Sequence, residues 1–254
     1  MAAPTALVTG ASSGLGAAFA RRLARDGYRP ILVARRAERL EALAAELGGG
    51  EVLPLDLARP EDLRRAEERL SADPAPELLI NNAGGLRFGA FEELDVDAEE
   101  ELLRVHVVAA MRLTHAALAR MLPAGRGAIV QVASRSAFAA SAQVPTYAAA
   151  KAFLHRHALG LAPRAAERGV RILSLCPGNV RTELFERGGL DPETIAALAM
   201  LEPEQVVDEA LAALAAGATV CVPGEGGRDR ALRRLLPRAV LRKAAGVLQR
   251  LADA

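Results

Sequence analysis

Short apolar runs alternate with longer amphipathic stretches from one end of this chain to the other. Continuous apolar strands separated by helical stretches are typical of a parallel sheet whose two faces are both covered by helices. The sequence therefore predicts a doubly wound α/β fold around a mostly parallel, seven-stranded sheet. The predicted strands lie at 5–10, 30–35, 51–56, 77–84, 127–134, 170–178 and 218–224, and the predicted helices at 14–26, 37–47, 60–71, 98–121, 145–168 and 203–216.

The chain is long enough to bury one sizeable core. It has 254 residues, of which 51% are hydrophobic and 25% charged, and no compositional break precedes residue 223 or so. We expect a single domain over 1–227 and a separate appendage over 228–254. In a doubly wound fold ligands bind beyond the carboxyl ends of the strands, so the functional residues are expected there.

Composition also argues against several classes of protein. Aromatic residues make up only 3% of the chain, which leaves little for stacking on nucleic acid bases. Cys176 and Cys221 stand inside apolar runs, which disfavours a disulfide scaffold or a zinc site, and no metal is expected. The N-terminus enters a strand and a glycine turn within a few residues, so we expect no leader peptide and a cytoplasmic protein.

A glycine turn follows the first predicted strand and precedes a helix. Gly10, Gly14 and Gly16 stand in "TGASSGLG". Glycines allow a tight turn and let a diphosphate approach the N–H groups at a helix N-terminus, where the helix dipole favours an anion. A glycine turn alone is weak evidence, but the strand before it and the helix after it favour a dinucleotide site.

The charged residues that follow the second and third strands indicate which dinucleotide would bind. Arg35 and Arg36 follow the second strand, where a carboxylate would bind the ribose hydroxyls of NAD and arginines would attract the 2′-phosphate of NADP. NADP(H) is therefore expected over NAD(H), although two arginines at a helix start can also be solvated charge. Asp56, which ends the third strand, is either an acceptor for adenine or the N-cap of the next helix.

The stretch "YAAAK" places the rare residues Tyr147 and Lys151 on one face of a helix, since residues four apart are neighbours there. A nearby ammonium favours a phenolate, and we expect Lys151 to lower the pKa of Tyr147 toward the range of a general acid/base. Ser134 ends a strand thirteen residues earlier, where its hydroxyl could hold a substrate carbonyl. Ser136 is the rival serine.

In this order, "TGASSGLG", "NNAG", the strand-end serine, "YAAAK" and "PGNVRT" resemble the short-chain dehydrogenase/reductase family over roughly residues 4–223. The resemblance implies a Rossmann-like fold in which Tyr147 moves the proton, Lys151 holds the nicotinamide ribose and Ser134 orients the carbonyl. Asn82 would lie beside the adenosine ribose, and Asp56 and Leu57 would meet the adenine. The complete set of cofactor-binding residues implied is Gly10, Ser12, Ser13, Gly14, Leu15, Gly16, Arg35, Arg36, Asp56, Leu57, Asn82, Ala83, Gly84, Tyr147, Lys151, Pro177, Gly178, Val180 and Thr182.

His106 is where the chain departs from the family pattern. Many members have an asparagine there that completes a proton relay behind the lysine. An imidazole could join such a relay near neutral pH, so His106 is counted among the candidate catalytic residues. The alternative is a core histidine with no part in the reaction.

Two further segments, 183–203 and 228–254, each have alternative interpretations. Residues 183–203 follow "PGNVRT" and are either a lid over an apolar substrate pocket or an ordinary amphipathic helix. Residues 228–254 combine eight basic residues with two aspartates and apolar residues at helical spacing. Such a segment either lies on an anionic membrane or, more often, packs on its own domain or on a partner subunit. A homodimer or homotetramer is expected.

The leading hypothesis is an NADP(H)-dependent oxidoreductase that transfers hydride between nicotinamide and a ketone or aldehyde, or a secondary alcohol. The substrate is expected to be a small, apolar carbonyl compound or alcohol. A catalytically weak NADP(H)-binding sensor or scaffold is the alternative, and a reductase of lipid-like substrates docked to membranes through 228–254 is a third.

Overall fold

The computed structural model describes residues 3–224. The predicted appendage at 228–254 lies outside the described residues. Within them, seven strands form one sheet in the order β3-β2-β1-β4-β5-β6-β7, and every pairing is parallel. The predicted fold class is thus confirmed. The strands are β1 (Thr5–Thr9), β2 (Arg29–Ala34), β3 (Glu51–Pro54), β4 (Leu78–Asn81), β5 (Gly127–Val132), β6 (Val170–Leu175) and β7 (Val220–Cys221).

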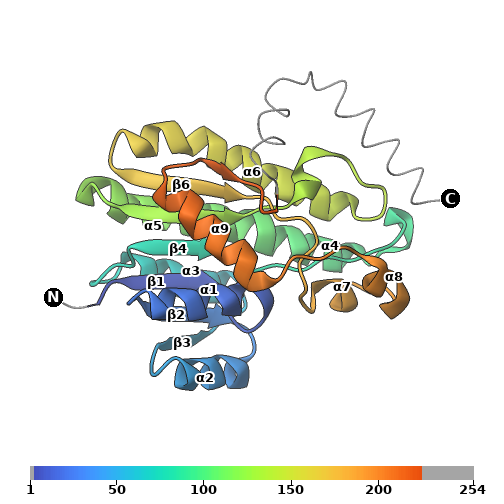
Figure 1. The fold of residues 1–254 in the computed structure, drawn as a ribbon, viewed down its shortest axis with the longest axis horizontal. Coiled ribbons are helices and arrows are strands. Elements are labelled where there is room, and N and C mark those ends of the chain that lie inside the picture. Colours follow the sequence, from blue (N-terminus) through green and yellow to red (C-terminus); the bar gives the residue numbers. More distant parts are fainter. Residues whose placement is uncertain (1–2, 225–254) are drawn as a thin grey trace.

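Helices cover both faces of this sheet, and each face has its own core (Figure 1). One face carries α1 (Gly14–Arg25), α2 (Ala37–Glu46) and α9 (Pro203–Ala215). The other carries α3 (Pro60–Ser71), α5 (Ala110–Ala124) and α6 (Pro145–Ala166). The strands supply both cores because successive side chains point to opposite faces: on β1, Ala6 and Val8 enter the first core and Leu7 enters the second.

The predicted helix at 98–121 is longer than expected and is interrupted. It comprises α4 (Val96–Leu103), a π-helical segment η2 (Arg104–Ala109) and α5, which ends at Gly125 in the left-handed conformation. Single π turns inside α-helices are frequent at functional sites, and this one contains His106. Among the described residues, Val96–Ala124 is the segment long and apolar enough to cross a bilayer. Three residues of this segment, Leu113, Ala117 and Met121, pack in the second core of the fold.

The segment 183–203 forms an excursion between β6 and α9. It contains α7 (Leu184–Arg187) and α8 (Pro192–Ala197), which contact each other beyond the sheet (Figure 1). An isolated parallel bridge between Val180 and Leu201 closes the base of the excursion. Two further short helices, η1 (Phe91–Glu93) and η3 (Arg135–Phe138), were not predicted because their few residues carry no periodic apolar pattern.

Candidate active site

The glycine turn lies between β1 and α1, at the carboxyl edge of the sheet. Gly10 and Gly14 have positive φ angles of 68° and 52°. A Cβ at Gly16 would lie 2.2 Å from the carbonyl oxygen of Gly10, so only glycine fits there. The N-cap residue Ser13 makes no side-chain hydrogen bond to the helix, and the first turn of α1 contains no acidic residue. These features suit the diphosphate of a dinucleotide, because backbone N–H groups and the helix dipole face it without a competing carboxylate.

Thr9 joins this turn to the loop after β4. Its hydroxyl donates to the carbonyl of Ile80 at 3.1 Å and accepts from the N–H groups of Asn82 and Ala83 at 2.9 and 3.0 Å. The amide of Asn82 donates to the carbonyl of Thr9 at 2.9 Å. Asn82, expected beside a ribose, therefore holds the glycine turn in place. Sequence reasoning did not single out Thr9, although it begins the "TGASSGLG" motif.

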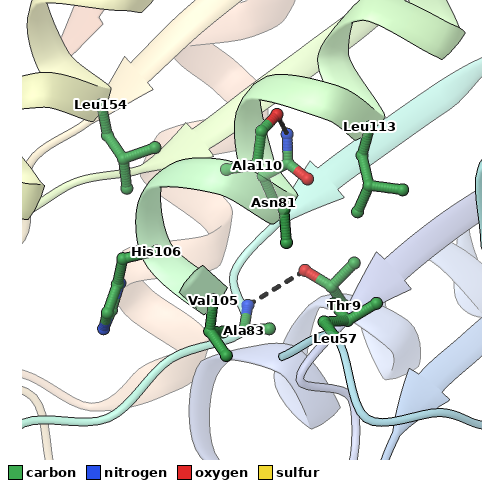
Figure 2. A pocket seen from close by; sticks show the side chains of 10 residues that line it. Thr9, Leu57, Asn81, Ala83, Val105, His106, Ala110, Leu113 and Leu154 are labelled. Carbon is green, nitrogen blue, oxygen red and sulfur yellow. Dashed lines mark hydrogen bonds between the residues drawn. The ribbon is translucent and has the colours of Figure 1, made fainter. Parts of the chain in front are cut away.

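Figure 2 shows the hydrogen bond from the Ala83 N–H to the Thr9 hydroxyl among the residues that line a small cavity, with His106 farther along its wall. The cavity measures about 10 Å³ and is lined by residues of β1, β4, η2 and α5. Asn81 forms part of its wall and donates to the hydroxyl of Thr114 at 3.0 Å. A space of this size is too small for an organic substrate and has room for about one water molecule.

The two arginines after β2 point to different partners. Arg36 donates to the hydroxyls of Ser12 at 3.0 Å and Ser13 at 2.9 Å, which brings a guanidinium against the glycine turn. Arg35 instead pairs with Glu101 of α4 at 3.1 Å. Arg39, one turn further along α2, was missed although the spacing of three from Arg36 places both on one helix face. It pairs with Glu183 at 2.7 Å.

Asp56 and Leu57, which are expected to contact the adenine, also make contacts within the protein. The carboxylate of Asp56 accepts from the N–H of Ala58 at 3.1 Å in the turn before α3. The N-cap of α3 is Arg59, so the reading of Asp56 as an N-cap was wrong: the chain makes one more turn before the helix begins. The side chain of Leu57 is 6% exposed and packs in the second core, which leaves its backbone for a ligand.

Ser134, Tyr147 and Lys151 converge at the end of β5. Tyr147 and Lys151 lie on α6 and are 8% and 4% exposed. The Lys151 Nζ lies 5.4 Å from the centroid of the Tyr147 ring and donates to the carbonyl of Val132 at 2.7 Å. The Ser134 side chain is close enough to Tyr147 to lower its pKa, and its hydroxyl donates to that of Ser136 at 3.3 Å. Ser136 lies two residues further, in η3, and its N–H donates to the Ser134 oxygen at 3.1 Å.

Burial controls the protonation of this group. It raises the pKa of Tyr147 to about 12, and the hydrogen bond from Ser134 opposes that rise. Burial also lowers the pKa of Lys151 to about 7. The expected acidification of Tyr147 by Lys151 is therefore not what this structure gives, because desolvation of the phenolate is the larger effect. Tyr147 holds its proton at neutral pH, as a proton donor must.

His106 is 2% exposed in η2, and its Nε2 lies 2.8 Å from the carbonyl oxygen of Gly85 and 3.1 Å from the Gly85 nitrogen. Its Nδ1 is buried without a hydrogen-bond partner. Burial and the charge of Lys151 lower the pKa of His106 to about 3, so the imidazole is neutral. A Cβ at Gly84 would lie 2.0 Å from the His106 ring, which explains the glycine. The ring thus supports the loop after β4.

The motif "PGNVRT" lies against both halves of the site. The carbonyl of Pro177 accepts from the N–H of Arg135 at 2.9 Å, and Gly178 lies against the Arg135 side chain. Thr182 packs on the other half, because a Cβ at Gly14 would lie 2.9 Å from its methyl group. The Val180 side chain is buried in the first core, against which Leu15 also packs.

An apolar cluster surrounds Tyr147. Leu86 and Val144 pack against its ring, and Phe88 and Leu184 cover them. Phe185 of α7 stacks on Phe88 with 6.2 Å between ring centroids. No group of three His, Cys, Asp or Glu side chains gathers as metal ligands within residues 3–224.

Comparison with known proteins assigns this geometry to a family. The family model for short chain dehydrogenases matches residues 4–191. The chain is 37% identical over 184 residues to the D-threitol dehydrogenase of Mycolicibacterium smegmatis, covering 70% of this chain and 71% of that protein.

Two solved structures are similar over nearly the whole chain. A short-chain dehydrogenase from Sphingobium yanoikuyae in complex with NADPH has a TM-score of 0.85 and 35% identity, covering 98% of this chain and 95% of that one. A bulky-bulky ketone specific alcohol dehydrogenase from Comamonas testosteroni has a TM-score of 0.82 and 31% identity, with coverage of 94% and 93%. The chain therefore belongs to the short-chain dehydrogenase/reductase family of NAD(P)-binding oxidoreductases.

Proposed function

We propose that the protein is an NADP(H)-dependent oxidoreductase that interconverts a ketone or aldehyde and the corresponding alcohol, with Tyr147 as the general acid/base. The convergence of Ser134, Tyr147 and Lys151 at the carboxyl edge of the sheet, the edge that also carries the glycine turn, supports this proposal. The bound nicotinamide would supply or accept the hydride. Tyr147 would donate its proton to the carbonyl oxygen, which Ser134 would orient through its hydroxyl.

The preference for NADP(H) is supported by Arg36 and the hydroxyls of Ser12 and Ser13, which together form a cationic, donor-rich site. Phosphate oxygens are well matched to a guanidinium fork. The similar structure from Sphingobium yanoikuyae is in complex with NADPH, which agrees with this choice. Ser12, Ser13 and Arg36 would hold the 2′-phosphate.

An apolar substrate is favoured by the cluster around Tyr147. Leu86, Val144 and Leu184 would surround a carbonyl placed at the phenol, and the excursion at 183–203 would act as a lid. The similar protein from Comamonas testosteroni is a bulky-bulky ketone specific alcohol dehydrogenase. We therefore infer a bulky, mainly apolar carbonyl compound.

The deciding assay mixes the purified protein with NADPH and a panel of ketones and aldehydes of increasing apolar bulk, followed by cofactor absorbance. Turnover is expected with the native protein and a loss of about 10²- to 10⁴-fold with Tyr147→Phe. Equal rates for the two proteins would contradict the proposal. Tight NADPH binding without turnover of any carbonyl would instead favour the sensor or scaffold alternative.

The assembly and location of the protein stay predictions. Exposed apolar side chains on Val96–Ala124, among them Leu103, Val108 and Met111, support a homodimer or homotetramer. Light scattering of the purified protein would establish the number of subunits. A cytoplasmic location is expected.

A further inference from the structure

Glu183 stands immediately before α7, at the start of the 183–203 excursion, and reaches back to α2. One carboxylate oxygen accepts from Arg39 at 2.7 Å and the other from Arg36 at 3.3 Å. Hydrogen bonds from Arg39 and then from Arg36 lower the pKa of Glu183. The side chain is therefore an anion held between two guanidinium groups.

The same Arg36 group also donates to Ser12 and Ser13 of the glycine turn. Glu183 thus lies on the cationic, donor-rich site that suits the 2′-phosphate of NADP(H). Two arginines and one carboxylate leave a net charge of +1. Without the carboxylate the same site would carry +2, so an incoming phosphate has to compete with an internal anion.

We propose that Glu183 is a cofactor-specificity residue: its carboxylate occupies the site that would take the 2′-phosphate, so NADP(H) has to displace it while NAD(H) does not. The inference rests on the proposed phosphate site of Arg36, Ser12 and Ser13. The Glu183 carboxylate would therefore weaken the binding of NADP(H) and leave the binding of NAD(H) unchanged.

Displacement of Glu183 would also act on the excursion itself. The next residue, Leu184, packs in the cluster that contains Tyr147, and Phe185 stacks on Phe88. The preceding residue, Thr182, packs against Gly14 of the glycine turn. Release of the carboxylate therefore loosens a segment that touches both the cofactor turn and the apolar cluster, which couples the 2′-phosphate to access at Tyr147.

The test measures binding of two cofactor fragments, 2′,5′-ADP and 5′-AMP, by calorimetry. Glu183→Gln keeps the size of the side chain and removes its charge. It is expected to bind 2′,5′-ADP about fivefold more tightly than the native protein, as loss of a half-exposed ion pair implies, with 5′-AMP unchanged. Glu186→Gln is the matched control: Glu186 is exposed on α7, three residues after Glu183, so its neutralisation should leave both affinities at native values.

Hydrogen exchange of residues 184–187 provides a second readout. In the native protein 2′,5′-ADP should speed exchange there and 5′-AMP should not, whereas Glu183→Gln should exchange fast without ligand. If Glu183→Gln binds 2′,5′-ADP no more tightly than the native protein, the inference is overturned. If neither protein prefers 2′,5′-ADP to 5′-AMP, the phosphate site itself is refuted and the proposed cofactor preference falls with it.

Discussion

The rings of His106 and Tyr147 pack edge to face, with their centroids 5.6 Å apart and their planes at 86°. Edge-to-face packing is a favourable arrangement for two aromatic rings. Since the imidazole is neutral and also contacts Gly85, it links the loop after β4 to the proposed proton donor. The geometry around His106 leads to predictions about how stability depends on pH and about the effect of replacing this residue.

The first prediction concerns acid stability. The pKa of His106 is about 3 in the folded protein and 6.5 as a model value, so the unfolded chain takes up a proton first as the pH falls. Stability from this group is complete above pH 6.5 and is lost as the pH falls toward 3. Between pH 7 and 5 the native protein should lose about 2 kcal/mol more than His106→Asn. Urea unfolding at both pH values measures this, with exposed His115→Asn as the control; parallel losses in native protein and His106→Asn would refute it.

The second prediction concerns alkaline stability. Burial lowers the pKa of Lys151 from 10.5 to about 7, so between these values the unfolded chain holds a proton that the folded protein has released. The free energy of unfolding should therefore rise with pH, by about 3 kcal/mol from pH 7 to 10. The chain has only one other lysine, Lys243, so few groups obscure the effect. Denaturant titration should show the rise in native protein and its loss in Lys151→Met.

The third prediction concerns the pH dependence of the reaction. Because the pKa of Tyr147 is raised to about 12, the phenol is a ready donor for carbonyl reduction at neutral pH. Alcohol oxidation needs the phenolate, whose fraction rises about tenfold per pH unit below the pKa. The oxidation rate at saturating alcohol should therefore increase throughout pH 7–9 while reduction stays nearly level. A plateau in oxidation already at pH 7 would mean that the bound cofactor acidifies Tyr147 strongly.

The fourth prediction concerns the fit of His106 against Gly84. A Cβ at Gly84 would lie 2.0 Å from the His106 ring, and the buried ring has little room to retreat. Gly84→Ala should cost about 1–3 kcal/mol of stability. Combining it with His106→Asn should recover much of that loss, because the smaller side chain frees the space. Gly85→Ala is the control, since a Cβ there meets nothing within 4 Å. Additive costs in the double variant would refute the contact.

The fifth prediction separates the two adjacent arginines. Arg36 contacts Ser12 and Ser13, whereas Arg35 pairs with Glu101 away from the glycine turn. Arg36→Ala should weaken NADPH binding about 10- to 100-fold, as loss of a charge-assisted contact implies, with NADH little changed. Arg35→Ala removes the same charge from the neighbouring position and should have a smaller effect. Fluorescence titration with both cofactors measures this; a larger loss from Arg35→Ala would reverse the assignment.

The hydrophobic periodicity and the glycine turns of the sequence were enough to predict the strands, the helices and the ends of several helices. Alternating apolar strands and amphipathic helices placed all seven strands in a parallel sheet, as observed. Gly27, Gly48, Gly169 and Gly217 each follow a predicted helix, and all have positive φ angles. These features depend on residues near one another in sequence. The π-helical interruption around His106 leaves no periodic signal in the sequence, and it places the ring against Gly85 in the loop after β4.

The sequence by itself determined the fold class and the order of motifs along the strand ends, because hydrophobic period, glycine turns and spacing within a helix are local properties. Only the tertiary structure decided which side chains form hydrogen bonds and ion pairs with one another. It turned Arg36 toward the glycine turn and Arg35 toward Glu101, and brought Glu183 across from the far half of the sheet. It also decided that burial, rather than Lys151, governs the pKa of Tyr147. Desolvation and long-range ion pairs depend on which distant residues pack together, and no spacing in the sequence encodes that.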